Sequence, residues 1–501
     1  MKHWPYLLTA LVMLVIFGCR WFGPSDLYDN DQPKTVAYTI DMVEHGRWLL
    51  PVDMLGRPAT KPPMYNWIGA LFVAVGWHDE FALKLPSTLA ALFVLVLTWR
   101  VASRAARDTN TQGNPFAHNG DATMEIMPAS VAALACIVLM TGVSFAKLCY
   151  TARPDMVLTA FLFAGWAAAT SLLYNYEHNA DVGESWAAGA SCQFCLRIAL
   201  WLCVAGAALT KGLPALLLIL YVLLGAKLVG GRWSALWSTG IVWGLPMACA
   251  LFGAWVYGVY RINPEHFTDV FMGDETVGRV GRGGLIGIVL ELWKMPGQFV
   301  VKFLPWSLIV FMAGWDVVSR RRFSRWFSGA IGSALLWVVL TILFFSFSGG
   351  KRADYLTPAY PVAAVVVAVW LTGEGRRRWR IRAGYWAVAG LVVALAFGVH
   401  EFCIGDAARS GYGENIRMFV RQIHHQTRGQ PIRFEQTAYT PIQSLLGYNQ
   451  PDRVDPPDVP ARWLVRPADR DGAVVISDPI WVGGRRTEIK MALYPNDQVD
   501  K

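Results

Sequence analysis

Acidic and basic side chains gather in five short stretches of the sequence, and their types could support chemistry at a phosphate group. The stretches are 26–31 with Asp29 and Asp31, 60–63 with Lys61, 150–155 with Arg153 and Asp155, 210–212 with Lys211, and 348–355 with Lys351, Arg352 and Tyr355. A carboxylate can act as a general base toward a hydroxyl or an amine. Cations can hold a phosphate and stabilise the charge that grows on it as it leaves. The set therefore predicts transfer of a group away from a phosphate.

The stretch 259–298 adds further charged residues, namely Asp274, Glu275, Arg279 and Arg282. Asp29 and Asp31 have the spacing of a D-x-D pair. Paired aspartates could hold a divalent metal such as Mg²⁺, Mn²⁺ or Zn²⁺. The candidate ligands of such a metal are Asp29, Asp31 and Asp155.

Each of these charges also has a purely structural explanation. Asp155 beside Arg153 could form an ion pair at a helix end, and Lys211 could extend its amine toward the membrane surface. For a single residue, the structural explanation is the better one. For the whole set it weakens, because charged groups at the ends of spans tend to be functional when they face a cavity.

The elements that must position these residues are membrane helices. Of the 501 residues, 54% are hydrophobic and 16% are charged, and the apolar residues form runs long enough to span a bilayer. The expected spans are 5–22, 82–100, 127–146, 156–174, 194–209, 213–229, 234–258, 299–318, 329–348, 353–372 and 383–403. We therefore predict an all-α polytopic membrane protein with about 11–13 transmembrane helices, and we exclude a soluble protein.

The distribution of positive charge predicts the topology. The net charge is +9, and dense basic clusters fall at 100–107, 227–232, 320–325 and 376–382. These clusters all lie on the cytoplasmic side if the N-terminus is cytoplasmic and the short apolar stretch 64–77 lies along the membrane surface. All the acid and cation clusters then fall on the outer face. The basic residues form no continuous patch, which argues against a nucleic-acid partner.

The last part of the chain has a different character. Residues 404–501 lose the long apolar runs, and 414–426 has its apolar residues at helical spacing. The stretches 463–465 and 473–476 resemble short strands. We predict a transmembrane domain over 1–403 and a small C-terminal α/β periplasmic domain over 404–501.

The motifs resemble a known family of enzymes. Asp31, the stretch 41–51, Lys61-Pro62-Pro63, Arg153-Pro154-Asp155 and Thr210-Lys211-Gly212 occur in the order and spacing of the bacterial transferases that move 4-amino-4-deoxy-L-arabinose onto lipid A. The dolichyl-phosphate-mannose protein mannosyltransferases are wider relatives. The resemblance implies the membrane-embedded glycosyltransferase fold called GT-C, with juxtamembrane helices in the first outer loop. It also implies that Asp31, Asp155 and Lys61 are functional.

Two positions depart from the arabinose transferases. Gln32 follows the first aspartate, and Thr60 precedes Lys61, where that family usually has Glu. A missing acid could remove a contact to an amino sugar or to a metal. The resemblance therefore supports the fold and the donor class, and it leaves the sugar open.

We hypothesise an inverting glycosyltransferase in the bacterial inner membrane, with its site on the periplasmic face. The donor is a sugar on polyprenyl (undecaprenyl) phosphate, and the acceptor is lipid A, another glycan or a protein of the envelope. Asp31 and Asp155 are the candidate catalytic residues. The candidate ligands of the donor phosphate are Lys61, Lys211, Arg279, Lys351 and Arg352, and those that orient the acceptor are Asp29, Arg153, Glu275 and Tyr355.

Two other classes of function are open. A transporter or flippase for a lipid-linked sugar usually has polar groups near the bilayer midplane and internal repeats, whereas here the spans are apolar at their centres. A non-catalytic assembly protein would use 404–501 for its contacts. Product formation separates the enzyme from the transporter, and deletion of 404–501 tests the assembly protein.

Overall fold

The computed structural model describes the chain in two compact units. Unit 1 comprises Met1–Phe17, Leu89–Cys149 and Asp155–Ala396, and unit 2 comprises Gly18–Thr88, Tyr150–Pro154 and Phe397–Lys501. The described residues are 4–22, 31–53, 56–76, 80–112, 127–182, 190–268, 291–319, 330–348, 351–373, 383–399, 407–428, 430, 432–434, 461–469, 471–482 and 487–496.

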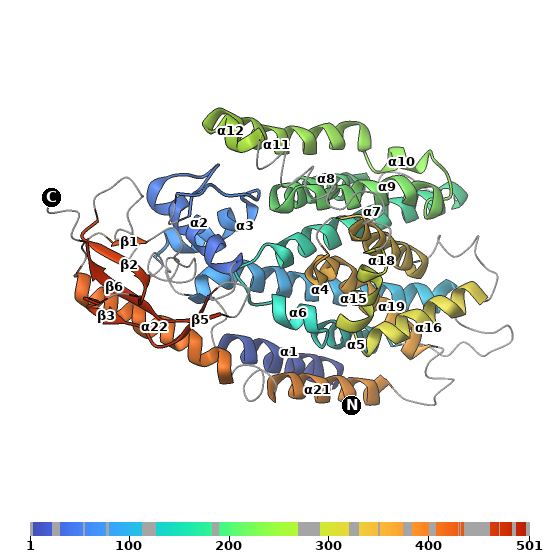
Figure 1. The fold of residues 1–501 in the computed structure, drawn as a ribbon. Helices are drawn as coiled ribbons and strands as arrows, with labels where there is room; N and C mark the ends of the chain where they lie inside the picture. The colour runs from blue at the N-terminus through green and yellow to red at the C-terminus, as the bar shows by residue number, and fades with distance from the viewer. Residues whose placement is uncertain are drawn as a thin grey trace. The chain divides into compact units, whose positions relative to one another are not determined.

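Unit 1 is helical (Figure 1). Its elements are α5 (Pro128–Met140), α6 (Val143–Leu148), α7 (Asp155–Val182), α8 (Ala190–Lys211), η1 (Leu213–Ala215), α9 (Leu216–Leu228), α10 (Ala235–Ser238), α11 (Ile241–Ile262), α12 (Pro264–His266), α15 (Lys294–Lys302), α16 (Trp306–Ser319), α18 (Ala330–Ser346), η3 (Ala353–Ala359) and α19 (Tyr360–Thr372). Three helices, α1 (Trp4–Phe22), α4 (Glu80–Gln112) and α21 (Ala383–Val399), have residues in both units.

The predicted spans fall on apolar helices. Among the described residues, six segments are long and apolar enough to cross a membrane: Pro5–Phe22, Glu80–Thr109, Asp155–Tyr176, Cys192–Lys211, Ile241–Ile262 and Ala353–Thr372. Shorter apolar helices, Pro128–Met140, Leu213–Leu228, Ile331–Ser346 and Val388–Phe397, cover four more of the predicted spans. Met64–Ala74, which we predicted to lie along the surface, is also a short apolar helix.

The predicted span over 299–318 is broken by a bend, which the sequence analysis did not predict. Two helices, α15 and α16, meet there at a bend of 115°. Pro305 lies in the break, and a proline both lacks an N–H to donate and disfavours the helical conformation of the residue before it. The apolar run is continuous in sequence, so its hydropathy alone did not reveal the bend.

Close packing of α7 against α8 builds the centre of unit 1 (Figure 1). Gly206 of α8 lies so close to Phe161 of α7 that a Cβ atom there would stand 2.5 Å from the ring. Small residues allow such approaches between membrane helices, where dispersion rather than water exclusion drives packing. This packing fixes the ends of both helices, which carry Asp155 and Lys211.

Unit 2 combines helices and sheets (Figure 1). Its helices are α2 (Asp31–His45), α3 (Met64–Ala74) and α22 (Ala407–Thr427), and its strands are β1 (Ile432–Phe434), β2 (Trp463–Pro467), β3 (Val475–Ile476), β4 (Ile480–Val482), β5 (Thr487–Ile489) and β6 (Met491–Pro495). The order in the larger sheet is β1-β2-β6-β3, with β1 parallel to β2 and the other pairs antiparallel. Strands β4 and β5 form a separate antiparallel pair.

The predicted helix over 414–426 and the predicted strands at 463–465 and 473–476 are therefore present as α22, β2 and β3. The first loop also contains two helices, α2 and α3, as the family resemblance implied. Hydrophobic side chains of the loop and of the C-terminal segment share one buried cluster: Val36, Ile40, Val73, Leu83, Ala152, Ile416, Phe419, Val420, Ile423, Ile432, Val465, Met491 and Leu493. The domain boundary at 403/404 remains a prediction.

Candidate active site

Asp31 and Arg153 face each other in unit 2. Asp31 is the first residue of α2, where the helix dipole favours a negative charge. Its Oδ2 lies 3.6 Å from Nη2 of Arg153, with 25% of the Asp31 side chain and 5% of the Arg153 side chain exposed. The distance is that of an ion pair, longer than a strong hydrogen bond. The Asp31 carboxylate is therefore charge-stabilised and still accessible to a substrate.

Asp155 and Lys211 form a tight buried pair in unit 1. Asp155 begins α7, and Lys211 ends α8 immediately before Gly212, whose φ of 71° turns the chain sharply. Lys211 Nζ lies 2.5 Å from Asp155 Oδ1, and only 8% of the lysine side chain and 3% of the aspartate side chain are exposed. Removing one partner of such a buried pair is strongly destabilising.

Tyr355 completes this arrangement. Lys211 Nζ stands 4.6 Å from the centre of the Tyr355 ring, a cation–π distance. Tyr355 belongs to η3, and its ring also lies 5.5 Å from that of Phe345. Residues that are far apart in sequence, Asp155, Lys211 and Tyr355, thus meet, as the predicted site required.

Lys351 is held by the backbone around it. Its Nζ donates to the carbonyl oxygens of Ser346 and of Ser348, and its own carbonyl accepts from Gln298 Nε2 at 3.0 Å. Burial lowers the pKa of the Lys351 amine, Glu291 opposes that shift, and Lys294 adds to it. The amine sits at the start of η3, outside the apolar span, and it is fixed in place rather than freely moving.

The other predicted site residues are less closely defined. Arg352 is exposed, and Lys61 is partly exposed at the end of the first-loop segment. Asp29, Glu275 and Arg279 lie outside the described residues, as do Asp274 and Arg282. Their predicted roles stay predictions.

The predicted metal ligands do not assemble into a metal site where the structure describes them. No group of three or more His, Cys, Asp or Glu side chains in the described parts of the chain could hold a metal ion. Asp31 faces Arg153 and Asp155 faces Lys211, so both aspartates already face a cation. No step proposed below uses a metal.

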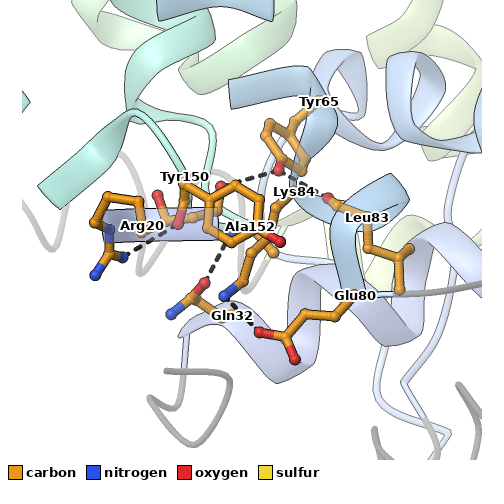
Figure 2. A network of polar contacts seen from close by, with 9 residues as sticks. Arg20, Gln32, Tyr65, Glu80, Leu83, Lys84, Tyr150 and Ala152 are labelled. Atoms are coloured by element: carbon orange, nitrogen blue, oxygen red, sulfur yellow. Dashed lines mark hydrogen bonds and ion pairs between the residues drawn. The ribbon is translucent and has the colours of Figure 1, made fainter. Parts of the chain in front are cut away.

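A second polar network in unit 2 was not predicted from sequence (Figure 2). Lys84, with 1% of its side chain exposed, bonds to Glu80 at 2.7 Å and lies 4.7 Å from the centre of the Tyr150 ring. Arg20 Nη2 donates to the Tyr150 carbonyl oxygen at 3.2 Å. The sequence did contain one indication of this network, a lysine inside the apolar stretch 81–87. The acidic residue nearest to that lysine is Glu80, one helical turn earlier.

Asp41 organises the turn between the two first-loop helices. Its carboxylate accepts from the Val52 amide at 2.8 Å and from Arg47 at 3.0 Å, and His45 lies 3.1 Å away. Burial raises the pKa of the Asp41 carboxyl, although the Val52 N–H, Arg47 and His45 oppose the shift. This stretch, 41–51, carried much of the family resemblance, and its acid serves the fold of the loop.

Sequence comparisons find distant relatives over most of the chain. No family model matches it. An uncharacterized protein of Aquifex aeolicus is 25% identical over 395 residues, which cover 74% of this chain and 65% of that protein. The undecaprenyl phosphate-alpha-4-amino-4-deoxy-L-arabinose arabinosyl transferase 1 of Pseudomonas fluorescens is 24% identical over 78% of this chain and 62% of its own length. The corresponding transferase of an Enterobacter species is 22% identical over 97% of this chain and 86% of its own length.

The chain thus spans slightly less than two thirds of the length of the first two relatives. Solved structures extend the likeness to the fold. ArnT from Cupriavidus metallidurans bound to undecaprenyl phosphate superposes with a TM-score of 0.65 at 18% identity, over 98% of both chains. The archaeal oligosaccharyltransferase AglB from Archaeoglobus fulgidus gives a TM-score of 0.52 at 12% identity, over 93% of this chain and 69% of the other. The predicted GT-C fold is confirmed.

Proposed function

We propose that this chain is a GT-C glycosyltransferase that moves a sugar from polyprenyl phosphate to an acceptor in the bacterial envelope, with inversion at the anomeric carbon. The observation that carries the proposal is the accessible Asp31 carboxylate beside Arg153, in a fold shared with ArnT over 98% of both chains. The named sugar transferases among its relatives support the same donor class. The relatives that carry a functional name are transferases rather than transporters.

Asp31 is the general base in this proposal. It accepts the proton of the acceptor hydroxyl as that oxygen attacks the anomeric carbon. The bond from carbon to the phosphate oxygen breaks, its electron pair stays on the phosphate, and polyprenyl phosphate leaves. Arg153, 3.6 Å away, orients the Asp31 carboxylate. Attack opposite to the leaving group inverts the configuration.

Lys211 is one of the proposed ligands of the donor phosphate. Its amine has three N–H donors, and Asp155 occupies one of them at 2.5 Å. Asp155 thus positions the amine, and the Tyr355 ring limits its position from another side. Held in this way, the amine stabilises growing negative charge with little rearrangement.

Lys61, Lys351, Arg352 and Arg279 are the further candidates to hold the donor phosphate. Lys351 donates to two carbonyl oxygens and has one more N–H to offer a phosphate. Once cations neutralise it, a lipid phosphate leaves readily, so no second carboxylic acid is needed. A glycosidase, in contrast, must protonate a poor leaving group and uses paired carboxyl groups to do so.

The location of the reaction is part of the proposal. The charge distribution of the sequence supports a cytoplasmic N-terminus, with the site and the C-terminal segment on the periplasmic face of the inner membrane. Lipid A, another glycan and an envelope protein are the proposed acceptors. The apolar helices provide the surroundings that a lipid-tailed donor needs.

Reconstituted protein tests the proposal directly. Proteoliposomes that contain the full chain are given synthetic undecaprenyl-phosphate sugars and lipid A, and the lipids are analysed by mass spectrometry. We expect a glycosylated acceptor and free undecaprenyl phosphate in equal amounts from the wild type, and neither from Asp31→Asn. Movement of labelled donor across the bilayer without product would refute the proposal in favour of a flippase.

A further inference from the structure

The segment between α6 and α7 is buried although it has no regular secondary structure. Residues Tyr150, Thr151, Ala152 and Arg153 are each at most 6% exposed. Buried backbone outside helices and sheets must find hydrogen-bond partners elsewhere, because an unpaired group costs the full desolvation penalty. The partners of this segment therefore show what holds it in place.

Three side chains of unit 2 bind its carbonyl oxygens. Arg20 donates to the oxygen of Tyr150 (Figure 2). The Tyr65 hydroxyl lies within hydrogen-bond distance of two carbonyl oxygens, that of Thr151 at 3.1 Å and that of Leu83 at 3.0 Å. Ser87 Oγ reaches the oxygens of Thr151 at 2.6 Å and of Arg153 at 3.1 Å. These bonds fix the direction of the chain as it reaches Arg153.

Gln32 binds the same segment as an acceptor, whereas the other side chains donate to it. The Ala152 N–H donates to Gln32 Oε1 at 2.8 Å, and Gln32 is only 1% exposed (Figure 2). Asp31, the residue before it, faces Arg153, the residue after Ala152. Neighbouring residues of α2 thus contact neighbouring residues of the segment. One contact is a neutral hydrogen bond and the other is an ion pair.

We propose that Gln32 is a positioning residue for the transfer reaction, which holds Arg153 at its distance from the Asp31 carboxylate. This inference rests on the proposed function. The Asp31–Arg153 separation of 3.6 Å is too long for the ion pair alone to fix its geometry, whereas the 2.8 Å bond to Ala152 is directional and shielded from water. The Gln32 amide oxygen supplies the acceptor that the buried Ala152 N–H needs.

A pair of substitutions of similar length isolates the acceptor oxygen. Gln32→Met keeps the apolar stem and removes the acceptor, and Gln32→Glu keeps an acceptor oxygen. Gln422→Met, at an exposed position of α22, is the matched control. We expect Gln32→Met to lower kcat about 10–100-fold, because displacement of a catalytic group by about 1 Å can cost that much. We expect the KM of Gln32→Met for the donor to stay within a factor of about two, since binding of the donor in its ground state does not involve Gln32. Gln32→Glu should retain most of the activity.

A double-mutant cycle with Arg153 tests whether Gln32 acts through the ion pair. If it does, adding Gln32→Met to Arg153→Met lowers kcat by less than threefold, which is about 0.65 kcal/mol. A purely structural defect would instead reduce the activity of Arg153→Met by the same factor as that of the wild type. That result would overturn the inference. So would an equal loss of kcat in Gln32→Met and Gln32→Glu, or wild-type kinetics for Gln32→Met.

Hydrogen exchange separates this inference from the proposed function. The fragment that contains Ala152 is followed by mass spectrometry in the full-length protein, and Gln32→Met is expected to exchange faster there than Gln422→Met. If the wild type makes no glycosylated product, the proposed function fails. If exchange at Ala152 is the same in Gln32→Met as in Gln422→Met, the hydrogen bond between Gln32 and Ala152 does not protect that amide, and the inference about Gln32 fails as well. If the wild type is active, the kinetic comparison decides the role of Gln32.

Discussion

The buried pair of Lys211 and Asp155 allows a sharp prediction about stability. Lys211→Met removes the ammonium group and leaves the Asp155 carboxylate, 3% exposed, without that partner. Asp155→Asn leaves the opposite charge behind. The double variant removes both charges. We expect the double variant to be destabilised by much less than the sum of the losses in the two single variants.

The magnitude follows from the geometry. At 2.5 Å the Coulomb attraction of two unit charges is about 7 kcal/mol if the effective dielectric constant is about 20. Desolvation of the two groups offsets part of it, and loss of one partner of a buried pair typically costs about 3–5 kcal/mol. The double variant leaves no unpaired charge in the buried site. The coupling energy should therefore lie near the top of the range of about 0.5–3 kcal/mol seen for residues in contact.

Equilibrium unfolding in mixed micelles measures these terms, with the intrinsic fluorescence of the 23 tryptophans as the signal. Lys227→Met is the matched control, because Lys227 is exposed at the end of α9. Its free energy of unfolding should change by about 0.5 kcal/mol or less. A Lys211→Met variant as stable as this control, or a double variant as unstable as the sum of the two single variants, would show that the pair contributes no coupling.

Three further outcomes are expected. Asp31→Asn should lower kcat about 10²–10⁴-fold in the proteoliposome assay, the contribution of a general base, without a change in thermal unfolding. Burial lowers the pKa of the Lys351 amine, so if its charge holds the donor, activity should fall on the alkaline side below the pH at which an ordinary lysine deprotonates, and Lys351→Arg should move that limb upward. Phe419→Ala, in the buried cluster of unit 2, should cost about 3–5 kcal/mol and speed hydrogen exchange in α2, whereas Met418→Ala, at a position 38% exposed, should do neither.

The membrane helices could be predicted because hydrophobic length is a direct physical requirement of the bilayer. That the short apolar helix at 64–74 lies along the surface rather than crossing stays a prediction from its length and from the charges around it. The bend at Pro305 was not predicted, because the hydropathy of a segment carries no information about the angle between its two halves. That angle depends on which helices pack against the break.

The site was predicted in part for a similar reason. Asp31, Asp155 and Lys211 stand beside turn-forming residues at the ends of apolar runs, so their type and place in the sequence are unusual. The sequence marked Gln32 as a departure from the family and Lys84 as a lysine in an apolar stretch, but it did not reveal the partners of either residue. Gln32 matters only because its oxygen meets the Ala152 amide, a contact across 120 residues of chain. Such partners become visible only once the fold brings them together.

The packing of unit 2 changes how the role of the C-terminal segment should be tested. In sequence, 404–501 has the composition of an appended domain, and its deletion looked like a clean test of whether it serves only for assembly. In the structure, Ile416, Phe419 and Ile423 of α22 share a buried cluster with Val36 and Ile40 of α2, the helix that begins at Asp31. Deletion would therefore expose the apolar side of α2 and disturb Asp31 whether or not the segment has any other role. Loss of activity after deletion would not distinguish an assembly surface from structural support, whereas substitutions on the exposed side of α22 leave the cluster intact and can make that distinction.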